Sequence, residues 1–150
     1  KKGDKKPEDN VMDLLDNLVY VGVAFLTLGM MMGALWAKEA WGTYWSWDPK
    51  ETWAFISVIF YAVVLHLRLV PKLRGTLTFN IASLWAIWSV IFTYFGVNYY
   101  LSGLHSYAAG DPMPVPAWIY ISATAMLVLT LSAYLRKKLT DKAQNFGQSA

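Results

Sequence analysis

The sequence predicts an all-α integral membrane protein with four antiparallel transmembrane helices that form part of a larger helical bundle. The first observation is composition, because 56% of the 150 residues are hydrophobic and the mean hydropathy is +0.33, which is too apolar for an ordinary soluble domain of this size. The second is that four apolar runs are long enough to cross a hydrocarbon core of ~30 Å at ~1.5 Å per residue. The connections between them are short, which favours antiparallel neighbours.

The predicted helices cover residues 18–36, 53–70, 80–101 and 117–135, within a transmembrane domain of residues 18–135. None of these runs contains Asp, Glu or Lys, and His66 and Arg68 are their only basic side chains. Residues 1–17 are charged and lack the apolar core of a signal peptide, so we expect a cytoplasmic tail or linker there. Residues 136–150 are expected to form a cytoplasmic C-terminal tail.

Basic residues indicate the orientation, because short loops rich in Lys and Arg are retained on the cytoplasmic side. Eleven of the thirteen basic residues lie before the first predicted helix, at the end of the second or between the second and third, or after the fourth: Lys1, Lys2, Lys5, Lys6, Arg68, Lys72, Arg74, Arg136, Lys137, Lys138 and Lys142. Both termini are therefore predicted to face the cytoplasm. The net charge of +3 is explained by basic ends that meet anionic membrane lipid, so we predict no nucleic-acid partner.

A tryptophan-rich segment, residues 41–53, joins the first two predicted helices and is expected to face outward. Its aromatic residues are Trp41, Tyr44, Trp45, Trp47 and Trp53. Two interpretations are open, an aromatic belt at the membrane interface and a platform for a flat ligand. Within the segment, Asp48 is a predicted helix N-cap, with Pro49 at the first helical position and Glu51 as the capping-box partner. This local pattern requires no ligand.

Two histidines are candidate ligands of haem iron, because neutral imidazole binds iron well. His66 lies ~20 Å below the outer end of its helix at ~1.5 Å per residue. An ionisable residue inside a membrane helix is a functional candidate, although a place near the inner headgroups is an alternative. His105 lies in an outer connection, where simple solvation is the alternative. The two cannot bind one haem within a protomer, so each needs a second axial ligand from elsewhere.

The tryptophan-rich segment closely resembles the WWD signature of the CcsA or ResC proteins, which handle haem in cytochrome c biogenesis. The resemblance includes the runs Phe92-Thr93-Tyr94-Phe95-Gly96-Val97-Asn98 and Gly103-Leu104-His105-Ser106-Tyr107, and the order of the four helices. It covers about residues 13–136, so the chain looks like the C-terminal part of such a protein. The stretch Trp-Asp-Pro-Lys-Glu-Thr favours this system over the other bacterial maturation pathway, whose haem-handling proteins also carry a WWD block.

The resemblance implies that haem b is the cargo. Haem would cross from the inner side to an outer site and be attached there to the CxxCH segment of apocytochrome c. Residues implied to help seat this haem are Trp41, Trp45, Trp47 and Asp48. His105 is implied as an outer axial ligand, and His66 as a ligand of a transmembrane haem. The chain itself contains no cysteine, which excludes covalent CxxCH attachment within it.

The resemblance also implies an enzyme that works with other parts, namely a cytochrome c haem lyase (holocytochrome c synthetase) with a CcsB/ResB-type partner subunit or fused half. Family members have a further outer histidine and another membrane histidine, and neither lies in these 150 residues. The expected location is the bacterial cytoplasmic (inner) membrane, or the thylakoid membrane in a plastid. One alternative is a haem exporter or chaperone without ligation activity. Another is a haem-containing electron-transfer subunit, which would usually have paired histidines at matched depths.

Overall fold

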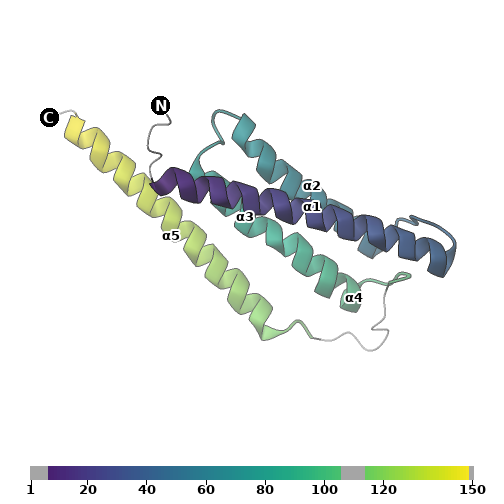
Figure 1. The fold of residues 1–150 in the computed structure, drawn as a ribbon. Helices are drawn as coiled ribbons and strands as arrows, with labels where there is room; N and C mark the ends of the chain where they lie inside the picture. Colours follow the sequence, from purple (N-terminus) through teal and green to yellow (C-terminus); the bar gives the residue numbers. More distant parts are fainter. Residues whose placement is uncertain (1–6, 106–113, 149–150) are drawn as a thin grey trace, which may run out of the picture. The chain divides into compact units, whose positions relative to one another are not determined.

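The computed structural model describes residues 7–105 and 114–148, and its long elements are all helices (Figure 1). The elements are α1 (Pro7–Trp41), α2 (Pro49–His66), η1 (Leu67–Leu69), α3 (Thr76–Ile91), η2 (Phe92–Gly96), α4 (Val97–Tyr100) and α5 (Ala117–Gln148). η1 is a 3-10 turn and η2 is a π-helical turn. No strand occurs within the described ranges.

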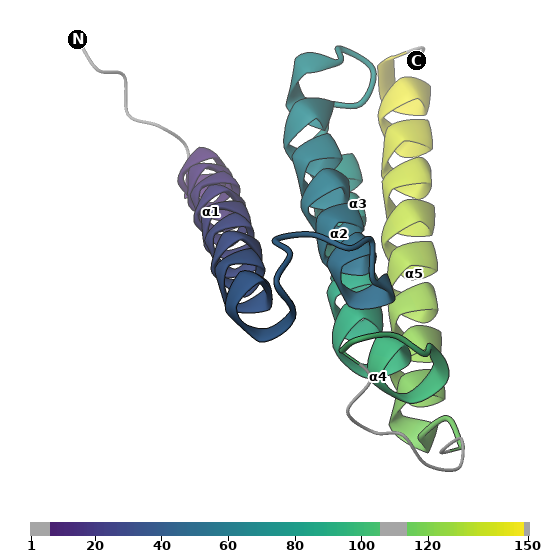
Figure 2. The ribbon, with the colours of Figure 1, turned by 90° about the vertical axis from the view of Figure 1, so that its right-hand side faces the viewer.

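Four of the described helical spans are long and apolar enough to cross a membrane: Asn10–Trp41, Pro49–Leu69, Thr76–Tyr100 and Ala117–Phe146. This confirms the predicted all-α membrane class. The chain divides into two compact units, Lys1–Pro112 with α1 to α4 and Met113–Ala150 with α5. Within the first unit, α1, α2 and α3 run in alternating directions, and the connections on the two sides of α2 lie at opposite ends of the unit (Figure 2).

The helices extend beyond the apolar runs from which they were predicted. Residues 7–17, for which we expected a tail or linker, belong to α1, and residues 136–148 continue α5. The reason is that charged residues mark where the membrane should end, whereas a helix continues until capping or Pro and Gly stop it. Met12 and Leu15 also pack against the buried core, which gives the start of α1 a tertiary contact.

The core of the first unit lies where α2 packs against α3, with α1 beside α2. Val64, Phe79 and Ala86 are buried there. Arg68 joins the three helices at one end: its Nη2 and Nε donate to Asp16 Oδ1 at 2.6 and 3.2 Å, and its guanidinium lies 4.1 Å from the centre of the Phe79 ring. These contacts explain how an arginine is accommodated next to an apolar run.

A second contact joins α2 to η2, directly after α3, through polar side chains. The hydroxyls of Ser57 and Thr93 lie 3.2 Å apart, and Ser57 is fully buried. The π-helical turn η2 interrupts the helix that was predicted as continuous over residues 80–101. Gly96 ends this turn against the ring of Phe92, where an added Cβ would approach ring carbons to 2.5 and 2.6 Å. The Phe92 ring in turn packs on Trp53, with centroids 4.3 Å apart.

Residues 117–135 of α5 are mainly apolar, and large side chains such as Ile121 and Leu131 are exposed. Its hydroxyls bond to carbonyls of the preceding turn, as in Ser122 Oγ to Trp118 O at 2.7 Å. A hydroxyl in hydrocarbon needs such a partner, because no water is present to replace it. This pattern therefore suits a helix surrounded by lipid or by other apolar helices.

Candidate functional site

Asp48 begins α2 and forms the capping box that its sequence predicted. Its Oδ2 accepts from the backbone N–H of Lys50 at 3.1 Å, while Glu51 Oε2 accepts from the backbone N–H of Asp48 at 3.3 Å. The same Glu51 oxygen accepts from the N–H and hydroxyl of Ser46 at 2.8 and 3.2 Å. Local hydrogen bonds thus fix the end of the tryptophan-rich segment to the start of α2.

The Asp48 carboxylate also holds a segment that is more than fifty residues away in the sequence. Oδ1 accepts from the backbone N–H of Leu104 at 2.5 Å, and Oδ2 accepts from His105 Nδ1 at 2.9 Å. The Asp48 side chain is only 3% exposed and that of His105 14%. A single buried carboxylate therefore caps α2 and positions the imidazole. We refer to Asp48 and His105, with the backbone N–H of residue 104, as the carboxylate–histidine site.

This hydrogen bond sets the tautomer of His105. An ionised carboxylate can only accept, so Nδ1 of His105 carries the shared hydrogen. In the neutral ring, the lone pair is then on Nε2, which is the nitrogen that can bind iron. A carboxylate behind a ligating imidazole is the usual arrangement that orients such a ligand.

Gly103 allows the approach of this segment to Asp48. A Cβ at Gly103 would overlap Asp48 Oδ1 and would lie 2.8 Å from Pro49 Cδ. The clash involves a buried carboxylate that is already fixed by three donors, so it cannot be relieved by a simple side-chain movement. Glycine at this position is therefore a requirement of the carboxylate–histidine site.

We expect Gly103→Ala to displace His105 and, if His105 is the axial ligand that the resemblance implies, to weaken haem binding by about 10- to 100-fold, the range for loss of a group that orients a metal ligand. The haem affinity of the purified full-length protein would be measured by titration with added haem. Ser102→Ala is the matched control, since it changes the neighbouring exposed side chain without adding an atom. Equal haem affinity in the Gly103→Ala variant and the wild type would contradict this role.

Two tryptophans enclose the imidazole of His105. The Trp41 ring lies edge-on to it, with centroids 4.4 Å apart and an interplanar angle of 82°. Trp36 lies 6.3 Å from the imidazole and 5.0 Å from Trp41. These rings restrict rotation of the imidazole and keep water from part of its surface. Trp36, which ends the first predicted helix, thus belongs to the site.

The other tryptophans of the segment form a separate pair. Trp45 packs edge-on against Trp47 at 5.7 Å and against Phe55 at 6.3 Å. Trp47 has a φ of 60° and is 70% exposed. A left-handed conformation is unfavourable for a bulky residue, and it presents this ring at the surface while Asp48 next to it is buried. Trp47 is therefore available to a ligand or to lipid.

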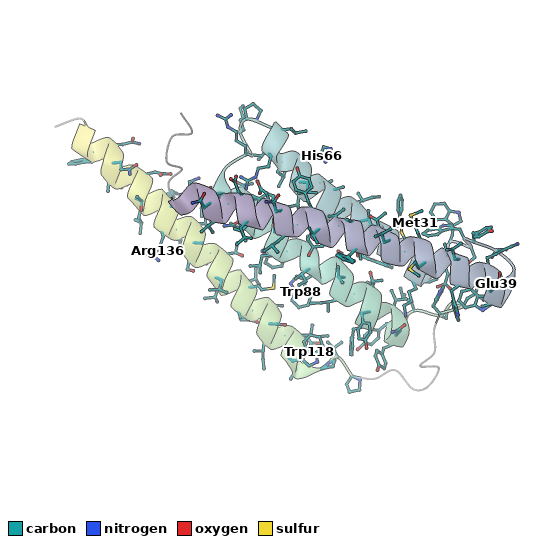
Figure 3. All side chains as sticks on the ribbon, in the orientation of Figure 1. Met31, Glu39, His66, Trp88, Trp118 and Arg136 are labelled. Carbon is teal, nitrogen blue, oxygen red and sulfur yellow. The ribbon has the colours of Figure 1, made fainter. Side chains whose placement is uncertain are left out.

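His66 lies at the opposite end of α2 from Asp48 (Figure 3). Its Nδ1 donates to the Ala62 carbonyl at 2.7 Å, so Nε2 again carries the lone pair of the neutral ring. The ring is exposed and borders an apolar groove of about 390 Å³, which is lined by Ile59, Ala62, Val63, His66, Leu67 and Val70. With 18 residues in α2 at ~1.5 Å each, the two histidines are too far apart to ligate one iron.

The structure thus brings His105, Asp48 and Trp41 together, pairs Trp45 with Trp47, and keeps His66 apart. Within the described residues, no three His, Cys, Asp or Glu side chains are grouped to hold a metal ion. A haem iron requires only one or two protein ligands, because the porphyrin supplies four nitrogens, and single histidines suit that chemistry. Ser106 and Tyr107, which were part of the resemblance, lie outside the described residues.

Comparison with known proteins shows similarity across most of the chain. The family described as Cytochrome C assembly protein matches residues 2–105. Protein NrfI of Wolinella succinogenes is 46% identical over 136 residues, which cover 91% of this chain and 15% of NrfI. Cytochrome c biogenesis protein CcsA of Chlamydomonas reinhardtii is 48% identical over 111 residues, or 71% of this chain and 31% of CcsA. CcsA of Prochlorococcus marinus is 53% identical over 97 residues, which cover 62% of this chain and 31% of that CcsA. The chain therefore spans less than a third of the length of these curated relatives.

Proposed function

The chain belongs to the cytochrome c assembly protein family, that of the CcsA proteins, and on this basis we propose that it binds haem b and presents it for covalent attachment to apocytochrome c. The observation that carries the proposal is the buried hydrogen bond between Asp48 and His105. It supplies what an axial ligand needs, namely a defined tautomer and a fixed ring direction. A solvated loop histidine would need neither a buried carboxylate nor enclosing tryptophans.

In this proposal the aromatic residues hold the porphyrin after His105 binds its iron. Trp47 offers an exposed flat surface and Trp45 supports it from the side. Trp41 acts mainly through His105, since its ring packs against the imidazole. Asp48 likewise acts through His105 rather than by touching haem, because its carboxylate is buried and its oxygens accept from protein N–H groups.

His66 serves, in our proposal, as a ligand of a second haem within the membrane. The groove beside it is apolar, which suits the face of a porphyrin, and its Nε2 lone pair suits iron. The separation of the two histidines along α2 then corresponds to the inner and outer ends of a haem path across the membrane. The second axial ligand at each site comes from a CcsB/ResB-type partner subunit or fused half.

The chemistry of attachment depends mainly on position. Each cysteine thiol of the CxxCH segment adds its sulfur to one carbon of a haem vinyl group and its hydrogen to the other, which forms a thioether without a leaving group. No side chain of this chain is assigned as acid or base. Holding iron and porphyrin rigidly lets the vinyl groups and the thiols meet in a productive orientation, which lowers the entropic part of the barrier.

We place the protein in the bacterial cytoplasmic membrane, or in the thylakoid membrane of a plastid. The carboxylate–histidine site faces outward and both termini face inward. This orientation is supported by the distribution of Lys and Arg and agrees with the position of apocytochrome c, whose thiols are presented outside. Membrane lipid surrounds the exposed apolar helix faces.

Covalent attachment in a system without other maturation factors tests the proposed function. Full-length protein, together with its partner half and an apocytochrome that carries CxxCH, is expected to yield a cytochrome that retains haem after denaturation. The matched control is an apocytochrome whose two cysteines are replaced by alanine. Haem transfer across the membrane without covalent product would instead establish the exporter or chaperone alternative.

A further inference from the structure

The two histidines donate from Nδ1 to acceptors of different charge. His105 donates to the carboxylate of Asp48 at 2.9 Å, whereas His66 donates to the neutral carbonyl of Ala62 at 2.7 Å. The distances are similar and the ring nitrogens are the same. The two hydrogen bonds therefore differ in the charge of the acceptor.

The negative charge of Asp48 is built into the fold. The side chain lies at the N-terminus of α2, where the helix dipole favours an anion, and it accepts from three N–H groups, those of Lys50, Leu104 and the His105 ring. It is shielded from water, with 3% of its side chain exposed. In such surroundings a charge acts more strongly on its neighbour than it would in water.

An imidazole that donates to a carboxylate gains electron density at its other nitrogen. This raises the basicity of Nε2 and strengthens its bond to a metal. The stronger donor stabilises ferric iron more than ferrous iron, because the ferric ion has the higher charge. A carbonyl acceptor, as for His66, produces a smaller effect of the same sign.

We infer that the Asp48 carboxylate is a positioning residue that lowers the reduction potential of haem at His105. The inference rests on the proposed haem ligation by His105. It assigns Asp48 an electronic role in addition to fixing the orientation of the ring. By the thermodynamic cycle that links ligation and reduction, the carboxylate strengthens the binding of ferric haem more than the binding of ferrous haem.

The chain offers a matched pair of variants to test this role. Asp48→Asn retains an oxygen that can accept from His105 and remains a good N-cap, but it removes the charge. Glu51→Gln removes a carboxylate from the same capping box, where glutamine is an accepted residue. Glu51 accepts from Ser46 and from the Asp48 backbone.

Spectroscopic redox titration of the full-length protein in detergent provides the measurement. A His66→Ala background is used so that the outer haem is followed alone, with haemin added where loading is incomplete. Asp48→Asn is expected to shift the midpoint potential to more positive values and to weaken ferric binding more than ferrous binding. Glu51→Gln is expected to shift the potential much less.

An unchanged potential in Asp48→Asn, or an equal shift in Glu51→Gln, would overturn the inference. If the Asp48→Asn protein loads no haem, Asp48→Glu supplies the second test, since it retains the charge and should restore a low potential if it restores loading. A low-loading Asp48→Glu protein with a raised potential would also count against the inference. These failures differ from failure of the proposed function, in which His105→Ala would leave the spectrum of the outer haem unchanged.

Discussion

His105→Ala is expected to reduce holocytochrome formation by about 100-fold or more, since misplacement of reactants by about 1 Å can already cost this much. In the proposed site, loss of the imidazole would remove the protein ligand that this chain offers to the iron. The porphyrin would then be held by aromatic contacts alone, which would fix neither its depth nor its rotation. The measurement is the yield of denaturation-resistant haem in an apocytochrome expressed with the full-length protein.

Leu104→Ala is the matched control for the change at His105. The Leu104 side chain is half exposed, and the variant keeps the backbone N–H that donates to Asp48. Its yield of holocytochrome should stay close to that of the wild type. If His105→Ala and Leu104→Ala give equal yields at equal protein levels, the axial role of His105 is wrong.

His66→Ala is expected to lower the haem content of the protein purified from cells by about tenfold or more. Loss of a residue that only supports a metal ligand typically lowers metal affinity by about 10- to 100-fold, and loss of the ligand itself should cost at least the lower figure. If the membrane haem feeds the outer site, this variant should also lose holocytochrome formation. Because the carboxylate–histidine site remains intact at the other end of α2, haem supplied from the outer side should restore attachment.

The control for His66 lies in the same groove. Val63 is exposed there and borders the same hollow, but it has no donor atom for iron. Val63→Ala should retain most of the haem of the wild type. Normal haem content in His66→Ala would remove this histidine from the proposed path, and failure of external haem to restore attachment would show that its role is not limited to supply.

Sequence reasoning recovered the features that depend on nearby residues. The four apolar runs predicted the membrane helices, and the Asp48-Pro49-Lys50-Glu51 pattern predicted the capping box that is observed. Helix ends were harder to predict. Met12 and Leu15 pack against the core near the start of α1, and no local sequence pattern indicates this tertiary contact. The π-helical turn η2 was missed for the same reason, since it depends on packing around Phe92 and Gly96.

The hydrogen bonds of Asp48 to Leu104 and His105 could not be predicted from the residues next to Asp48 in the sequence. The N-cap pattern fully accounts for the carboxylate, so nothing there points to a partner at Leu104 or His105. Gly103 in the same run as His105 was a possible signal, because glycine permits close backbone approach, but the partner it approaches is fixed only by folding. The division between Trp41 at the imidazole and Trp47 at the surface likewise depends on the left-handed backbone of Trp47.

The most direct test of the central claim, that His105 is an axial ligand of haem, is the reduced-minus-oxidised absorption spectrum of full-length protein purified in detergent. The account predicts low-spin haem bands in the wild type that are diminished or shifted in His105→Ala, while Leu104→Ala resembles the wild type. A folded wild-type protein without haem bands after loading with haemin, or identical spectra in wild type and His105→Ala, would contradict it.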